Sequence, residues 1–139
     1  MARTAYAQGG EPRYVPFLPD GAQNEWIENG KQFYLTKRNP DANWENRTLL
    51  WSYDKLVQYS AVDIIELLSP TPLLIVAGSK AETLDQSQKP YELAREPKEL
   101  FLVEGGKHSD FYDRPEFIAP AIEKIDAFYK AAGRLPEIA

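Results

Sequence analysis

The sequence predicts an α/β fold organised around two parallel strands. Two short apolar runs, at about residues 72–77 and 99–104, are continuous rather than alternating. Continuous apolar runs are typical of strands that are buried on both faces of a parallel sheet. The segment between them, residues 87–95, has helical character and is long enough to cross over between parallel strands. A polar loop follows each run, and open α/β sheets place their sites in such loops.

These two loops contain the candidate functional residues. Glu82 lies in the loop after the first strand, and His108, the only histidine of the chain, lies in the loop after the second. Taken alone, a histidine in a polar loop is also compatible with an ordinary surface residue. Glu82 is likewise compatible with a solvated loop acid or with a charge at a helix N-terminus. Their occurrence in consecutive loops after strands is the main functional clue in the sequence.

The same region resembles the C-terminal part of an α/β-hydrolase, in the branch of dienelactone hydrolases and esterase-like proteins. The resemblance is carried by PTPLLIVAGSKAET and YELAREPKELFLVEGGKHSDFYDRPE; it covers about residues 14–132 and is densest from Ser69 to Pro115. In this family the catalytic triad runs nucleophile, acid, histidine along the chain. The resemblance implies that His108 is the catalytic histidine and Glu82 the acid, at a position where the branch usually carries Asp. Asp85 is a second candidate for the acid. A small ester, lactone or related acyl substrate is implied.

No nucleophile is recognisable in these residues. The family places its serine on a sharp turn with a Gly-x-Ser-x-Gly pattern, and this pattern is absent from the sequence. Ser79 lacks the second glycine and belongs to the acid loop, and the chain has no cysteine. The oxyanion-hole segment of the family also belongs to its N-terminal half. The sequence therefore predicts the acid and histidine of a triad without a nucleophile, and a chain that is inactive alone.

Residues 1–68 precede this core. Residues 1–20 are expected to form an irregular arm, because proline occurs twice within Tyr14-Val-Pro-Phe-Leu-Pro. Residues 21–68 are expected to form a helical segment, with helices at about 22–36 and 48–59 and one or two helical turns at 61–68. The resemblance implies that this segment is cap-like and lines the substrate pocket. The three tryptophans fit this lining role or, alternatively, packing in a core or interface.

The final helix is defined by an apolar periodicity within the core segment, residues 69–133. One face is predicted to carry Ile118, Ile122, Ile125, Tyr129 and Ala132. Asp113 and Glu116 have the spacing of a capping box, and Gly133 suits the position after the helix end. Pro120 removes one backbone hydrogen bond, so the regular helix is expected to begin at about Ala119.

Composition excludes several classes of function. The 139 residues suit a single domain, and the net charge of −5 with scattered lysines and arginines argues against a nucleic-acid or anionic-membrane surface. One histidine, no cysteine and scattered carboxylates give no metal-ligand spacing, and no cofactor is expected. No apolar stretch approaches the ~20 residues of a membrane span, and no secretory signal is recognisable, so a cytoplasmic location is predicted.

Two parallel strands cannot cover their own edges, and exposed strand edges pair readily with other chains. We therefore expect either a homo-oligomer, a dimer in the first instance, or a complex with a chain that supplies the N-terminal half. Two functional hypotheses follow. In the first, the chain is the C-terminal half of a split serine hydrolase. In the second, it is a truncated module that self-associates without catalysis, and the missing nucleophile favours this hypothesis for the isolated chain.

Overall fold

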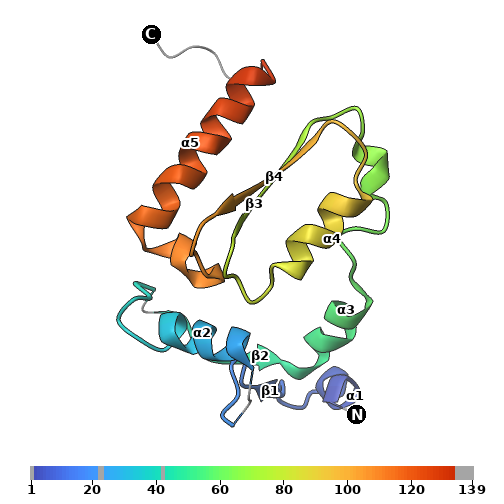
Figure 1. Cartoon of the computed structure of the whole chain (residues 1–139). Coiled ribbons are helices and arrows are strands. Elements are labelled where there is room, and N and C mark those ends of the chain that lie inside the picture. The colour runs from blue at the N-terminus through green and yellow to red at the C-terminus, as the bar shows by residue number, and fades with distance from the viewer. Residues whose placement is uncertain (1, 22–23, 42, 134–139) are drawn as a thin grey trace. The chain divides into compact units, whose positions relative to one another are not determined.

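The computed structural model describes residues 2–21, 24–41 and 43–133. These residues belong to two compact units, Met1–Ser60 and Ala61–Ala139. The expectation of a single domain stays a prediction. Figure 1 shows the elements of both units along the chain.

The first unit consists of short elements. They are α1 (Ala2–Ala7), β1 (Tyr14–Val15), α2 (Glu25–Tyr34), β2 (Thr48–Leu49), a 3₁₀ turn (Leu50–Ser52) and α3 (Tyr53–Gln58). The expected irregular arm at residues 1–20 is wrong, because this stretch contains α1 and β1. β1 pairs with β2 in antiparallel register, and Pro12 and Pro16 flank β1 in the sequence and limit its length. Because residues 48–49 pair with β1, the helix expected at residues 48–59 begins only at Tyr53.

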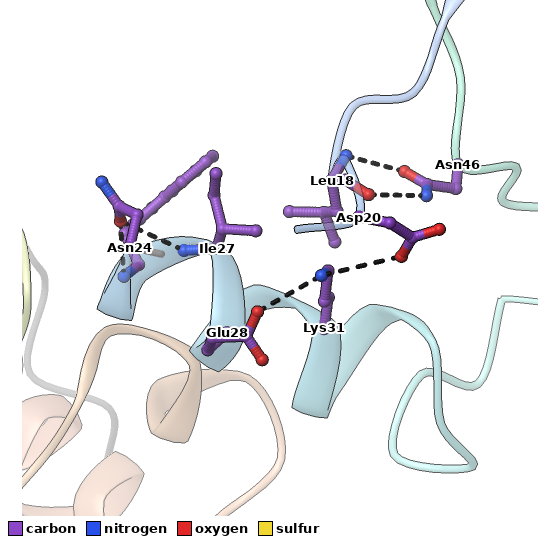
Figure 2. Close-up of polar contacts among 8 residues, drawn as sticks. Leu18, Asp20, Asn24, Ile27, Glu28, Lys31 and Asn46 are labelled. Carbon is purple, nitrogen blue, oxygen red and sulfur yellow. Dashed lines mark hydrogen bonds and ion pairs between the residues drawn. The ribbon is translucent and has the colours of Figure 1, made fainter. Parts of the chain in front are cut away.

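Helix α2 confirms the expectation of a helix near residues 22–36. Asn24 caps its N-terminus, since the Asn24 side-chain oxygen accepts a hydrogen bond from the Trp26 N–H at 2.9 Å. Lys31 forms ion pairs with Glu28 at 3.2 Å and Asp20 at 3.8 Å (Figure 2). The last pair ties the helix to the chain that precedes it.

Among the described residues of this unit, the buried apolar side chains are Leu18 and Phe33. The amide of Asn46 holds Leu18 through two hydrogen bonds, from the Leu18 N–H at 2.8 Å and to the Leu18 carbonyl at 3.0 Å (Figure 2). Gly30 of α2 permits this packing, because a Cβ atom there would lie 3.0 Å from the Leu18 side chain. The small core is therefore fixed by polar as well as apolar contacts.

The second unit has the predicted order of strand, crossover helix, strand and C-terminal helix. Its elements are a 3₁₀ turn (Ile65–Leu68), β3 (Leu73–Gly78), α4 (Asp85–Leu93), β4 (Lys98–Val103), a second 3₁₀ turn (His108–Tyr112) and α5 (Pro115–Ala131). β3 and β4 are parallel and in register from Leu73↔Lys98 to Gly78↔Val103. Figure 1 shows α4 and α5 on opposite sides of the two strands, and each helix contacts both strands. The predicted α/β fold with two parallel strands is confirmed.

Burial of the strands is incomplete. Ala77 and Val103 are buried, whereas the remaining side chains of β3 and most of those of β4 are half-buried. The sequence predicts strands that are covered on both faces, and a strand pair with one helix on each side provides only part of that cover.

Helix α5 directs a different face towards the strands from the one predicted. Ala121 is buried, and Lys124 forms an ion pair with Glu99 of β4 and lies 5.8 Å from the ring of Phe101. By contrast, Ile122 of the predicted stripe is 59% exposed. Because neighbouring helical positions are about 100° apart, the face that packs on the strands is offset from the predicted stripe, whose Ile125 and Tyr129 line a groove beside β3.

The N-terminus of α5 also differs from the expectation. Arg114 is the N-cap and Pro115 the first helical residue, so Asp113 does not cap this helix. Proline suits the first helical position because its fixed φ fits the helix and its missing N–H needs no partner there. The helix runs through Pro120 without interruption and does not begin at Ala119. At the other end, Gly133 has a φ of +64°, which confirms its predicted role after the helix.

Across the part of the chain that the structure describes, no helix has both the length and the apolar character that a bilayer span requires.

Candidate active site

Three hydrogen bonds join the ends of β3 and β4 and the first residues of the loops that follow them. The Ser79 N–H donates to the Val103 carbonyl at 2.9 Å, and the Lys80 N–H donates to the Gly106 carbonyl at 3.0 Å. The Ser79 hydroxyl oxygen accepts a hydrogen bond from the Gly105 N–H at 2.9 Å. These bonds continue the strand pairing beyond the strands and bring together the two loops that carry the candidate residues.

Two glycines make this close approach possible. A Cβ atom on Gly78 would lie 2.1 Å from the Gly106 carbonyl oxygen, closer than atoms can pack. A Cβ atom on Gly106 would lie 3.1 Å from Phe117 and 3.2 Å from Phe111. A side chain at Gly78 would therefore force the loop that leads to the histidine to move, whereas one at Gly106 would press on two phenylalanine rings.

The 3₁₀ turn that begins at His108 is held by the buried carboxylate of Asp110. Asp110 is 4% exposed, and it accepts a hydrogen bond from the Lys107 N–H at 3.0 Å. Its other carboxylate oxygen lies 3.1 Å from the Arg114 guanidinium. A buried carboxylate that closes the turn on both sides fixes the backbone from which the imidazole projects.

Both nitrogens of the His108 ring have hydroxyl partners. Nδ1 lies 3.4 Å from the Thr83 hydroxyl, in the loop after β3. Nε2 lies 2.8 Å from the Tyr112 hydroxyl, at the end of the same 3₁₀ turn. The rings of His108 and Tyr112 meet edge to face, with centroids 5.7 Å apart. The contact with Thr83 brings the two predicted loops together at a single histidine.

Neither of the two predicted acids contacts this histidine. Among the described residues, no hydrogen bond or ion pair joins Glu82 or Asp85 to His108. The Oε2 atom of Glu82 is buried without a hydrogen-bond partner, and Asp85 is an exposed residue at the start of α4. The structure thus places the neighbour of Glu82, Thr83, at Nδ1, and the role of Glu82 or Asp85 as the acid stays a prediction.

A cavity of about 380 Å³ opens beside the imidazole. Apolar walls come from the end of β3 and from the histidine turn, and polar groups come from α4 and the loop before it. The lining includes Val76, Ala81, Gln86, Ser87 and Phe111, together with Thr83, His108 and Tyr112. Apolar walls with a few convergent polar groups are typical of sites that bind small molecules.

Among the described residues no serine hydroxyl is bonded to His108, although Ser87 lines the cavity. The hydroxyl of Ser79 accepts the Gly105 N–H, and Ser109 is 2% exposed. The hydroxyl at Nε2 is instead that of Tyr112. In the described residues there is no cluster of three or more His, Asp or Glu side chains that would hold a metal ion.

Sequence reasoning missed Thr83 and Tyr112 as partners of the histidine. A signal existed for Tyr112, since residues four apart on a helical turn lie close together and Tyr112 follows His108 by four. The sequence gives no such signal for Thr83. Thr83 and Glu82 are adjacent, and the sequence does not determine which of the two side chains faces the loop after β4.

Comparison with known proteins defines the class: this chain has the fold of part of an α/β-hydrolase. No family model matches the chain. The crystal structure of the α/β-hydrolase GrgF from Penicillium is similar over 93% of this chain and 45% of GrgF, with a TM-score of 0.68 and 23% identity. In a sequence comparison, GrgF is described as a polyketide transferase, 26% identical over 113 residues, 78% of this chain and 38% of GrgF.

Two bacterial proteins match more of the chain in sequence. YcjY of Escherichia coli, an uncharacterized protein, is 30% identical over 133 residues, 93% of this chain and 44% of YcjY. A hypothetical protein of Pseudomonas aeruginosa has a crystal structure that is similar over 94% of this chain and 41% of its own, with a TM-score of 0.78 and 27% identity. This chain therefore spans less than half the length of these relatives, and its fold is that of part of an α/β-hydrolase.

Proposed function

We propose that this chain supplies the histidine of an acyl-transfer site of the serine-hydrolase type, which acts on a small ester or related acyl compound. The observation that carries this proposal is the contact between His108 and Thr83, which joins the two loops after the strands beside a cavity of about 380 Å³. The name of GrgF, a polyketide transferase, adds support for acyl chemistry. The chemistry needs no cofactor and no metal, and the cytoplasm stays the predicted location.

In the proposed reaction the nucleophilic hydroxyl comes from polypeptide outside these 139 residues. Its oxygen attacks the acyl carbon while its proton passes to Nε2 of His108. The imidazolium then returns this proton to the departing alcohol, which leaves an acyl-enzyme. Water or a second alcohol cleaves the acyl-enzyme by the same steps in reverse order. Glu82, or Asp85 in its place, would stabilise the imidazolium after a rearrangement of the loop that brings a carboxylate to Nδ1.

The oxyanion hole would likewise come from outside this chain. Loss of a single oxyanion-hole donor lowers kcat by about 10²–10³ in well-studied hydrolases. The isolated chain lacks a recognisable serine nucleophile as well, so we expect no ester turnover above a His108→Ala control.

The proposal is tested by a chimera in which these residues replace the matching C-terminal part of GrgF. We expect the chimera to release p-nitrophenol from p-nitrophenyl acetate, and His108→Ala to lower the rate by about 10³-fold or more. Tyr129→Phe serves as the control, since Tyr129 lies on α5 and does not line the cavity beside His108. A chimera that is folded by circular dichroism, and that reacts equally with and without His108, refutes the proposal.

Self-association without catalysis is the second candidate function, and the exposed apolar surface beside β3 favours it. In the described part of the chain β3 pairs only with β4, so its other edge is open. A groove of about 400 Å³ lies along β3 and α5, lined by side chains such as Leu74, Ile125 and Tyr129. Open strand edges and apolar grooves of this kind accept a strand from another chain.

Native mass in solution distinguishes the candidates. A dimer that loses affinity on Ile125→Asp, while Asp126→Ala has no effect, supports self-association through this groove. A monomer at all concentrations, together with a productive GrgF chimera, supports the split-hydrolase hypothesis and rules out the homo-oligomer.

A further inference from the structure

The hydrogen bonds of His108 contain information about its tautomer. A neutral imidazole carries one proton, so one ring nitrogen donates and the other accepts. Two arrangements fit the distances. Either Tyr112 donates to Nε2 and Nδ1–H donates to Thr83, or Thr83 donates to Nδ1 and Nε2–H donates to Tyr112. The first arrangement leaves the basic lone pair on Nε2, and the second leaves it on Nδ1.

The chemistry of the two hydroxyls favours the first arrangement. The oxygen lone pair of a phenol is delocalised into the ring, which makes a tyrosine a stronger hydrogen-bond donor and a weaker acceptor than an aliphatic alcohol. The distances agree with this assignment, because the contact of Nε2 with the phenol, at 2.8 Å, is much shorter than the contact of Nδ1 with Thr83, at 3.4 Å. A short bond to the better donor and a longer one to the better acceptor suit the Nδ1–H form.

We infer that Thr83 and Tyr112 are positioning residues that hold His108 as the Nδ1–H tautomer, with the Tyr112 hydroxyl bonded to the basic lone pair of Nε2. This is the tautomer that a general base requires when it takes a proton at Nε2. The Tyr112 hydroxyl then stands where the hydroxyl of a nucleophile would bind. Under the proposed function, on which this last point rests, the incoming nucleophile must displace Tyr112 from Nε2.

The backbone around Tyr112 supports a defined geometry. Tyr112 lies on the same 3₁₀ turn as His108, and the buried carboxylate of Asp110 anchors that turn to Lys107 and Arg114. The edge-to-face contact of the two rings, at an interplanar angle of 88°, further limits the orientations of the imidazole.

Nitrogen-15 NMR of the imidazole tests this inference, and it needs no assignment work because the chain has a single histidine. Spectra are recorded on the native chain at about pH 8.5, where an ordinary histidine is neutral. We expect the Nδ1–H form to predominate in the wild type. Tyr112→Phe and Thr83→Val should each lower the ratio of Nδ1–H to Nε2–H by about fivefold, the effect of one ordinary hydrogen bond.

Tyr129→Phe is the matched control, since it removes a half-exposed phenol on α5 and should leave the ratio unchanged. Reaction with diethyl pyrocarbonate gives a second readout, because freeing Nε2 in Tyr112→Phe should accelerate modification of His108 several-fold. A wild type that is mainly Nε2–H, or a folded Tyr112→Phe variant with an unchanged ratio and rate, overturns the inference. Neither measurement uses a nucleophile or substrate, so such a failure is separate from a failure of the GrgF chimera.

Discussion

Substitution of Gly78 by alanine should separate the two loops that form the candidate site. The added Cβ would lie 2.1 Å from the Gly106 carbonyl oxygen and 2.5 Å from its carbonyl carbon. Carbon and oxygen atoms in proteins approach to about 3.3 Å even in favourable contacts. The loops must therefore move apart by about 1 Å, and because both contacting atoms belong to the backbone, no change of rotamer relieves the clash.

The expected cost follows from the contacts that this movement disturbs. Overpacking typically costs about 1–3 kcal/mol. The movement also weakens the hydrogen bonds from Lys80 to Gly106 and from Gly105 to Ser79, each worth about 1 kcal/mol. Together these contributions predict that Gly78→Ala lowers the free energy of unfolding by about 3–5 kcal/mol.

Urea unfolding followed by far-UV circular dichroism measures this loss, and the NMR signals of His108 report on the site. Gly133→Ala is the matched control, because Gly133 has a φ of +64° and, among the described residues, only its chain neighbours lie within 4 Å of its Cβ position. The control carries only the conformational cost of a left-handed residue, about 1–2 kcal/mol. If Gly78→Ala is no less stable than Gly133→Ala and leaves the His108 signals unchanged, the reasoning is wrong.

Three further substitutions test the contacts around the site and the first unit. Asp110→Ala should lower the free energy of unfolding in urea by about 2–3 kcal/mol, because it removes a buried charge-assisted hydrogen bond. Arg114→Ala should cost less, since the Arg114 side chain is 46% exposed. An equal loss from both variants would contradict this reasoning. Ser79→Ala should cost about 1 kcal/mol, because only the acceptor of one backbone N–H is lost. Asn46→Ala should cost about 1–3 kcal/mol by leaving the polar groups of Leu18 without partners. Tryptophan fluorescence monitors the unfolding of Asn46→Ala, since all three tryptophans precede residue 60. An unchanged unfolding midpoint would contradict the predicted loss of stability.

The strands and crossover helix could be predicted because their signal is local. Each strand contains a short continuous apolar run bounded by turn residues, and a run of about four to eight residues is shorter than a typical buried helix. The order strand, helix, strand then places the following loops at one edge of the sheet. Consequently the location of His108 beside the loop of Glu82 followed from the sequence before any contact was known.

The errors in the first unit and in α5 arose where a distant partner decided the structure. Residues 14–15 form a strand because residues 48–49 pair with them, and neither pair of residues is long enough to signal a strand alone. In α5 two neighbouring stripes are apolar enough to face the core. The burial of Ala121 and the contact between Lys124 and Glu99 of β4 show which of the two packs on the strands.

The sequence by itself therefore determined the α/β class, the two parallel strands and the loops in which a site would form. Only the tertiary structure decided which side chains meet there. Glu82 and Thr83 are adjacent, and the path of the loop turns the hydroxyl of Thr83 towards His108 at 3.4 Å. The physical reason is the range of the forces involved. Burial of apolar surface produces local patterns of apolar residues in the sequence. A hydrogen bond instead requires a donor–acceptor distance accurate to tenths of an ångström, which the packing of both loops sets.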